Sequence, residues 1–151
     1  MIMNEFNNKK VEQFSRYEFK YILNEELKNK VESQIKHFMK YDGYVSSEYD
    51  DSYFVRSLYF DSPGSFNFYE KIDGIKKRKK FRLRTYDKKY KNSTLFIEQK
   101  GRNVNRVFKY RTAIRQNDIE KFYDAMNYDQ LIDNYKDIKI INEFVSDSVK
   151  R

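Results

Sequence analysis

A stretch of alternating residues between Arg78 and Thr85 constrains this chain more than any other feature of its sequence. Arg78, Lys80, Arg82 and Arg84 occupy every second position, and Lys79, Phe81, Leu83 and Thr85 lie between them. Successive side chains of a β-strand point to opposite faces, so this spacing predicts a strand with one cationic face and one mainly apolar face. The chain should therefore fold around a sheet that has a basic face.

The positive charge of the chain is concentrated around this strand. The 151 residues include 31 Lys and Arg against 23 Asp and Glu, a net charge of +8. Residues 76–111 contain 15 basic residues and only Asp87 and Glu98 as acids, a local charge of +13, so the rest of the chain sums to −5. A basic element in a mildly acidic body indicates a polyanionic partner such as a nucleotide, polyphosphate or nucleic acid. A solvated basic face is the alternative.

The remaining pattern predicts an α+β fold, with one antiparallel β-sheet and flanking helices. Aromatic and β-branched runs predict further strands at 14–23, 53–61, 94–100 and 106–114, the last two continuing the basic strand as a meander. Apolar spacing predicts helices at 24–40, 117–126 and 128–137 and a short helical turn at 65–72, while 138–145 stays ambiguous. Asn24 is a suitable N-cap for the first helix. We expect one domain, 14–151, behind a flexible N-terminus over residues 1–13.

Composition excludes several classes of protein. The chain has no Cys and a single His, His37, which excludes disulfide frameworks, thiol nucleophiles and Cys-ligated metals and nearly excludes His-based catalysis. With 14 Tyr and 13 Phe it can build a core, so wholesale disorder is excluded. No window approaches the roughly 18 apolar residues of a membrane span, and the first ten residues do not resemble a signal peptide. We expect a cytoplasmic protein.

Strand parity brings charged residues of four predicted strands to one face of the sheet. The set comprises Arg16, Glu18, Lys20, Arg78, Lys80, Arg82, Arg84, Glu98, Lys100, Lys109 and Arg111. A curved sheet around this face would form a cationic channel, and phosphate chains would separate cations that otherwise repel one another. A carboxylate among them could hold a divalent metal that bridges the phosphates. An outer face on which Glu18 and Glu98 are salt-bridge partners remains open as the alternative.

Six sequence blocks, in order and with matching spacing, resemble a known family. They are RYEFKY at 16–21, SLYFDSP at 57–63, YEK at 69–71 followed by Gly74, RKKFRLRTY at 78–86, FIEQK at 96–100 and KYR at 109–111. Over residues 14–115 the chain resembles the VTC domain, the polyphosphate polymerase domain of the vacuolar transporter chaperone complex and its bacterial relatives. That domain belongs to the triphosphate tunnel metalloenzyme superfamily, which is CYTH-like.

The resemblance implies a β-tunnel that binds ATP and inorganic polyphosphate, with divalent Mn or Mg at the phosphates. The terminal phosphoryl group of ATP would be transferred to polyphosphate, a reaction that needs charge and positioning rather than His or Cys. The resemblance, supplemented by parity for Arg78 and Lys80, implies three groups of site residues. The predicted catalytic residues are Arg82, Arg84 and Lys100, and the predicted metal ligands are Glu18 and Glu98. The predicted phosphate-binding residues are Lys20, Lys71, Arg78, Lys80, Lys109 and Arg111.

Other functions and other states of the chain stay open. A tunnel-type triphosphatase would use the same cations with an activated water, and a phosphate or polyphosphate sensor would use them without catalysis. Nucleic acid is disfavoured as a partner, because aromatic residues on these strands are expected to lie opposite the cations. In the family a second half follows, so the chain resembles the N-terminal half only. It is expected to be a fragment, to close a tunnel as a homo-oligomer, or to be inactive.

Overall fold

The chain folds into two structural units, a division that the sequence analysis does not predict. The structure is a computed structural model that describes residues 12–41, 43, 45, 52–86, 88, 93–135 and 138–150. One unit spans residues 18–54, and the other joins the residues before 18 to those from 55 onward. Within the described residues, no helix is both long enough and apolar enough to cross a bilayer.

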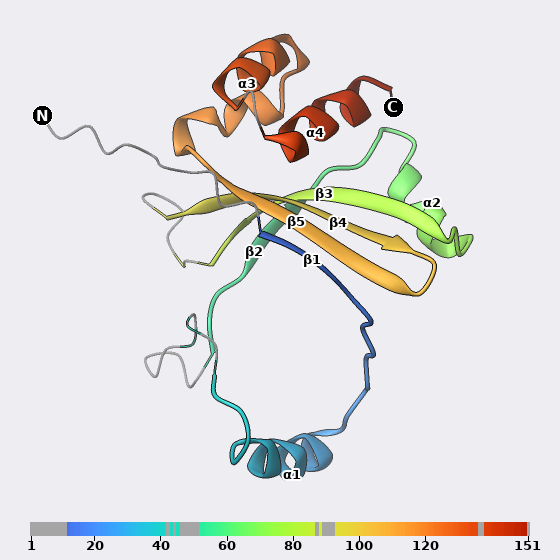
Figure 1. Cartoon of the computed structure of the whole chain (residues 1–151), viewed down its shortest axis with the longest axis vertical. Coiled ribbons are helices and arrows are strands. Elements are labelled where there is room, and N and C mark those ends of the chain that lie inside the picture. Colours follow the sequence, from blue (N-terminus) through green and yellow to red (C-terminus); the bar gives the residue numbers. More distant parts are fainter. Residues whose placement is uncertain are drawn as a thin grey trace, which may run out of the picture. The chain divides into compact units, whose positions relative to one another are not determined.

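The larger unit is built on a five-stranded antiparallel sheet with the order β1-β5-β4-β3-β2 (Figure 1). The strands are β1 (Glu12–Arg16), β2 (Arg56–Tyr59), β3 (Lys77–Thr85), β4 (Leu95–Asn103) and β5 (Arg106–Ile114). The predicted α+β class and the meander of β3, β4 and β5 are confirmed. Both edge strands are short, which limits the number of backbone groups open to unwanted pairing.

The first strand differs from its predicted range of 14–23. β1 begins at Glu12 and ends at Arg16, where it lies opposite Val107 of β5. Because β5 itself begins at Arg106, the sheet offers no further partner to the chain beyond this point. The predicted flexible tail lies outside the described residues over 1–11, and residues 12 and 13 belong to β1. The second strand, predicted over 53–61, is reduced to the four residues of β2.

The turn between β4 and β5 is tighter than the predicted connector over 101–105. Gly101 is part of β4, and a side chain at this position would meet the Phe108 ring. Glycine lets the Phe108 ring pack directly against the backbone of β4. Val104 closes the turn with a φ of 55°, which is unusual for a β-branched residue.

The described residues of the smaller unit contain one helix, α1 (Glu25–Ile35). The predicted N-cap is confirmed, since the Asn24 side chain accepts a hydrogen bond of 2.8 Å from the Leu27 N–H. The helix ends before the predicted Lys40, and His37 lies in the turn that follows. The predicted apolar stripe of Leu27, Val31, Ile35 and Phe38 is exposed, and α1 has no buried residue.

Outside the sheet, the larger unit contains α-helices and short 3₁₀ turns. They are α2 (Phe66–Ile72), the 3₁₀ turns η2 (Gln116–Asp118), η3 (Glu120–Phe122) and η4 (Ala125–Asn127), α3 (Tyr128–Asn134) and α4 (Lys139–Lys150). The predicted helical turn at 65–72 and helix at 128–137 are confirmed, and the ambiguous segment after residue 138 is helical. The continuous helix predicted over 117–126 is wrong, because three separate 3₁₀ turns replace it.

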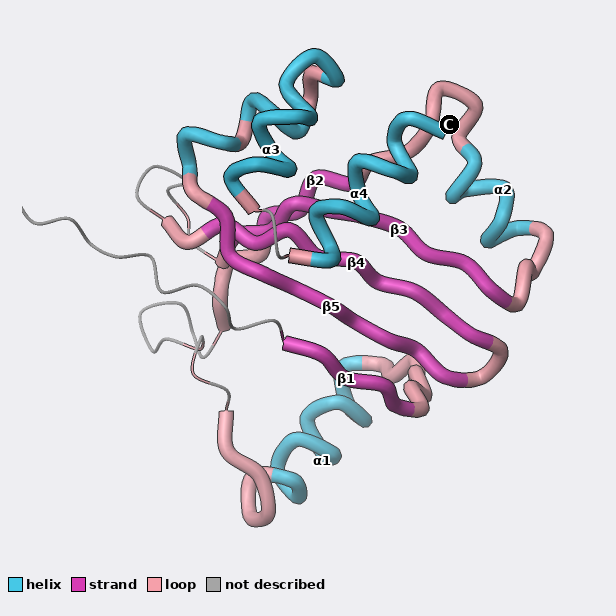
Figure 2. The backbone as a smooth tube through the Cα atoms, turned by 45° about the horizontal axis from the view of Figure 1, so that its top comes forward, coloured by secondary structure: helices cyan, strands magenta, loops and turns pink. Residues whose placement is uncertain are grey.

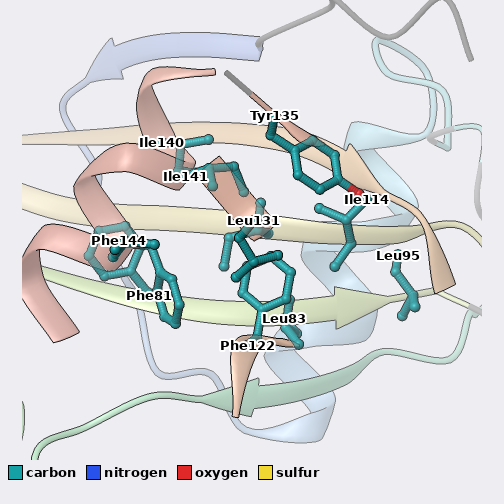
Figure 3. Packing of buried hydrophobic residues seen from close by; sticks show 12 residues of the cluster. Phe81, Leu83, Leu95, Ile114, Phe122, Leu131, Tyr135, Ile140, Ile141 and Phe144 are labelled. Atoms are coloured by element: carbon teal, nitrogen blue, oxygen red, sulfur yellow. The ribbon is translucent and has the colours of Figure 1, made fainter. Parts of the chain in front are cut away.

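The core lies between one face of the sheet and the helices α3 and α4, which cover that face (Figure 2). Phe81 and Leu83 of β3, Phe122 of η3 and Leu131 of α3 meet Phe144 of α4 and their neighbours there (Figure 3). The charged Lys79 points to the same face, and its amine lies 3.5 Å from the Asp147 carboxylate of α4. The opposite face of the sheet is left for the charged residues.

A buried aspartate joins the 3₁₀ turns to α3. Asp118 is 3% exposed and accepts hydrogen bonds from the Arg115 side chain at 2.9 Å and the Tyr135 hydroxyl at 2.9 Å. Lys121 and Asn134 donate to its other oxygen at 2.9 and 3.2 Å. Burial raises the pKa of Asp118, but the hydrogen bonds from Lys121, Tyr135 and Arg115 lower it by more, so its pKa is lowered overall.

We expect Asp118→Asn to lower the free energy of unfolding by about 1–3 kcal/mol at pH 7, because four donors lose their charged acceptor. A lowered pKa in the folded state means that the Asp118 contribution is present above its unfolded pKa and is lost as pH falls through the folded value. The difference between the two proteins should therefore shrink below about pH 4. Urea denaturation between pH 3 and 7 measures it, with Asp133→Asn as control. Equal stabilities at pH 7 would contradict this role.

Candidate functional site

The face of the sheet that α3 and α4 leave uncovered carries the charged residues of β3, β4 and β5. Residues directly opposite one another in antiparallel strands share a face, so the register identifies its members. In the described part of the chain nine basic residues belong to it: Arg16, Arg78, Lys80, Arg82, Arg84, Lys100, Arg102, Lys109 and Arg111. We call this surface the cationic face. Glu98 lies within it, between Arg82 and Arg111 in neighbouring strands.

An ion pair at the centre of the cationic face holds Arg82 in place. The Arg82 Nε and Nη2 atoms lie 2.7 and 2.6 Å from Oε2 of Glu98. Both residues are buried, with exposed fractions of 5% for Arg82 and 0% for Glu98. A side-on pair of this kind fixes the plane of the guanidinium group. Arg84 lies near the same oxygen, with its Nε at 4.0 Å.

Two hydroxyl groups of β2 complete the positioning of these arginines. Arg82 Nη1 donates to the Tyr59 hydroxyl at 2.6 Å, and Arg84 Nε donates to the Ser57 hydroxyl at 3.0 Å. Burial raises the pKa of Tyr59, but the hydrogen bond from Arg82 and the charges of Arg82, Lys80 and Arg84 together lower it by more, so its pKa is lowered overall. The edge strand β2 therefore helps to fix the two arginines of the face.

Aromatic rings lie among the cations, so the prediction that they would all fall on the opposite face is wrong. The register places Tyr59 opposite Arg82 and Phe96 opposite Arg84, on the cationic face. The Lys80 amine lies 4.9 Å from the centre of the Tyr59 ring, and the Arg111 guanidinium 4.6 Å from that of Phe96. Contacts at these distances are cation–π interactions. The argument against nucleic acid that relied on opposite faces is therefore removed.

Most of the predicted site residues come together. Arg82, Arg84 and Lys100, predicted as catalytic, share the cationic face with four of the predicted phosphate-binding residues, Arg78, Lys80, Lys109 and Arg111. Lys100 lies directly opposite both Lys80 and Lys109, which forms a row of three amines across the sheet. Arg78 also donates to the Ile75 carbonyl at 2.6 Å, an interaction that anchors its side chain beside β3.

Three predicted residues do not belong to the strands of the sheet. Glu18 and Lys20 belong to the smaller unit, where Lys20 Nζ lies 4.0 Å from the Glu18 carboxylate. The chain leaves the sheet after Arg16, so strand parity no longer applies to them. Lys71 is exposed in the last turn of α2 and belongs to no strand.

Sequence analysis missed three residues of the face. Arg102, Tyr59 and Ser57 share it by register, and each could have been found by parity. Arg102 is two positions beyond Lys100, on the same side of an extended β4. Ser57 and Tyr59 are two positions apart in β2, facing Arg84 and Arg82. Arg102 was missed because its strand was expected to end at residue 100. Ser57 and Tyr59 were missed because their side chains are uncharged.

The described residues do not fit a resident divalent metal ion. Within them, no three Asp, Glu, His or Cys side chains form a group that could hold one. One oxygen of Glu98 is taken by Arg82, and its other oxygen, Oε1, is buried without a hydrogen-bond partner. Mg²⁺ and Mn²⁺ prefer several oxygen ligands in a regular shell. A single carboxylate oxygen beside arginines does not supply them.

Comparison with known families gives one match over nearly the whole chain. The model of the VTC domain family matches residues 15–151. The chain belongs to the VTC domain family. The resemblance drawn from the six sequence blocks is thereby confirmed, and the match extends past β5 through the 3₁₀ turns to α4. A comparison with curated proteins gave no match.

We expect Glu98→Gln to destabilise the VTC domain by about 3 kcal/mol, because Arg82 would remain buried without its counter-ion. Tripolyphosphate should then stabilise the variant more than the unaltered chain, since loss of the Glu98 charge makes the cationic face more positive. Chemical denaturation with and without tripolyphosphate measures both effects. Glu120→Gln, which removes the same charge from an exposed position, is the matched control. The expectation is overturned if the two variants behave alike.

Proposed function

We propose that this domain acts like a polyphosphate polymerase, binding nucleoside triphosphate and inorganic polyphosphate on the cationic face. The observation that carries the proposal is the gathering of nine basic residues on one sheet face around the Arg82–Glu98 ion pair. Cations held this close repel one another unless an anion lies between them, and phosphate chains supply one negative charge per unit or more. Membership of the VTC domain family supports the same substrate class.

The proposed reaction is transfer of the terminal phosphoryl group of ATP to the end of a polyphosphate chain. A terminal oxygen of polyphosphate forms a bond to the γ-phosphorus as the bond between that phosphorus and the β–γ bridging oxygen breaks, and ADP leaves. Arg84 and Lys100 would contact the transferring group and neutralise charge on its oxygens. Lys80 and Lys109, on either side of Lys100, would hold the phosphates of the two substrates in line.

In the proposed reaction, a divalent cation would arrive bound to the substrate. ATP and polyphosphate carry Mn²⁺ or Mg²⁺ on their own oxygens, so the ion can arrive as a metal–nucleotide complex without a set of protein ligands. The chain would then contribute arginine and lysine side chains, which bind phosphate oxygens as forks and as point charges.

A second candidate is a phosphate or polyphosphate receptor without catalysis. The observation that favours it is the engagement of Glu98 by Arg82, which leaves the described residues without a metal-binding group. A hydrolytic tunnel enzyme that releases phosphate from triphosphates is a third outcome with the same cations. The product separates these functions: longer polyphosphate, free phosphate, or neither.

Polyanions should stabilise the larger unit in proportion to their phosphate number. We expect the melting temperature to rise in the order sulfate, pyrophosphate, tripolyphosphate, because each added phosphate meets more of the face. The rise should become smaller as salt screens the interaction, with a Debye length of about 10 Å at 0.1 M. Thermal denaturation at several salt concentrations measures this. Equal effects of sulfate and tripolyphosphate would indicate an ordinary basic surface.

If the domain is a polymerase, replacement of a single basic residue of the cationic face should strongly reduce polyphosphate synthesis. With ATP, Mn²⁺ and a short polyphosphate primer, we expect Arg84→Ala and Lys100→Ala to reduce polyphosphate formation about a hundredfold. The product is detected on a polyacrylamide gel, and released phosphate is measured in parallel. Lys139→Ala, which removes a charge from an exposed side chain of α4, is the control. Binding of tripolyphosphate with no product from the unaltered chain would favour the receptor.

A further inference from the structure

Tyr59 occupies a position on the cationic face that neither strand parity nor the family resemblance assigned. It lies in the edge strand β2 directly opposite Arg82, and its side chain is 49% exposed although its hydroxyl contacts a buried arginine. The ring lies beneath two cations, with the Lys80 amine at 4.9 Å and the Arg82 guanidinium at 5.5 Å from its centre. The residue therefore links the buried ion pair to the surface.

The contacts of Arg82 show why this link matters. Its Nε and Nη2 atoms are held by Glu98, and its Nη1 donates to the Tyr59 oxygen. With a side-chain exposure of 6%, Arg82 has little surface that an incoming phosphate could reach. The phenol oxygen accepts from Arg82 and keeps its own O–H as a donor, since a tyrosine hydroxyl can do both. In the described part of the chain, no acceptor takes that proton.

We propose that Tyr59 is a phosphate ligand of the cationic face, whose hydroxyl accepts from Arg82 and donates to a phosphate oxygen. This inference rests on the proposed function, because it requires that phosphate binds to this face. Arg82 is then a positioning residue. It orients the Tyr59 hydroxyl, and its positive charge makes that hydroxyl a stronger donor to the phosphate. Tyr59 rather than Arg82 touches the anion.

The electrostatics of the position favour donation. Burial raises the pKa of Tyr59, but the hydrogen bond from Arg82 and the charges of Arg82, Lys80 and Arg84 lower it by more, so its pKa is lowered overall. Glu98 of β4 pairs with Arg82 on the side away from the hydroxyl. A more acidic hydroxyl is a stronger hydrogen-bond donor, and donation to an ionised acceptor is roughly twice as strong as donation to a neutral one. A phosphate at this position would disfavour the phenolate and raise the pKa of Tyr59 again.

The test compares Tyr59→Phe with Tyr123→Phe. The substitution at 59 keeps the ring and removes only the hydroxyl, while Tyr123 is an exposed tyrosine of the helical side whose ring lies near Phe60. By isothermal titration calorimetry at pH 7.5, we expect tripolyphosphate to bind about tenfold more weakly to Tyr59→Phe, the loss of one charge-assisted hydrogen bond. The Tyr123→Phe variant should bind as the unaltered chain does.

A second measurement separates direct contact from mere support of Arg82. In the unaltered chain labelled with ¹³Cζ-tyrosine, the Tyr59 resonance should titrate at a higher pH when tripolyphosphate is present. The resonance is assigned with Tyr59→Phe or, should that variant fail to fold, with Tyr59→His. A Tyr59 pKa that tripolyphosphate leaves unchanged, or equal affinities of Tyr59→Phe and the unaltered chain, would overturn this inference alone. If tripolyphosphate does not bind the unaltered chain at all, the proposed function fails with it.

Discussion

The ion pair between Arg82 and Glu98 makes a densely cationic sheet face compatible with a folded protein. Burial of an arginine without a partner would cost several kcal/mol, and its basic neighbours would increase the repulsion. Glu98 removes this cost at the centre of the sheet and fixes the guanidinium plane at the same time. The remaining cations are arranged around a group that has been neutralised, so the face is ordered without a bound ligand.

The core and the candidate site are made by the same strands, and this couples them mechanically. In β3, Phe81 and Leu83 pack beneath the helices while Arg82 and Arg84 occupy the other face. The Phe144 ring of α4 lies 5.5 Å from that of Phe81, centre to centre, so the position of the helix affects the strand that carries both arginines. A substitution in the core can therefore displace the cations without touching them, because packed interiors transmit such shifts.

The sequence predicted the parts of this structure that follow from local periodicity. Alternation along β3 predicted a sheet with a basic face, and the same parity in β4 and β5 placed Lys100, Lys109 and Arg111 correctly. The features that the sequence did not predict depend on contacts between elements that are far apart along the chain. Lys20 lies past the end of β1, because β1 ends where β5 begins. The helix expected after residue 116 is replaced by 3₁₀ turns, where Asp118 bonds to Arg115, Lys121, Asn134 and Tyr135. Tyr59 was missed because its side chain is uncharged, and parity within β2 does not show that its hydroxyl meets Arg82.

The alternation of β3 also bears on how faithfully the chain can find its native pairing. A slip of one residue between β3 and β4 would turn Arg82 and Arg84 toward the helices and expose Phe81 and Leu83. Such a misfolded sheet would bury unpaired guanidinium groups and lose its apolar core together. The charges of the cationic face thus also penalise wrong strand registers during folding, whether or not a ligand is present.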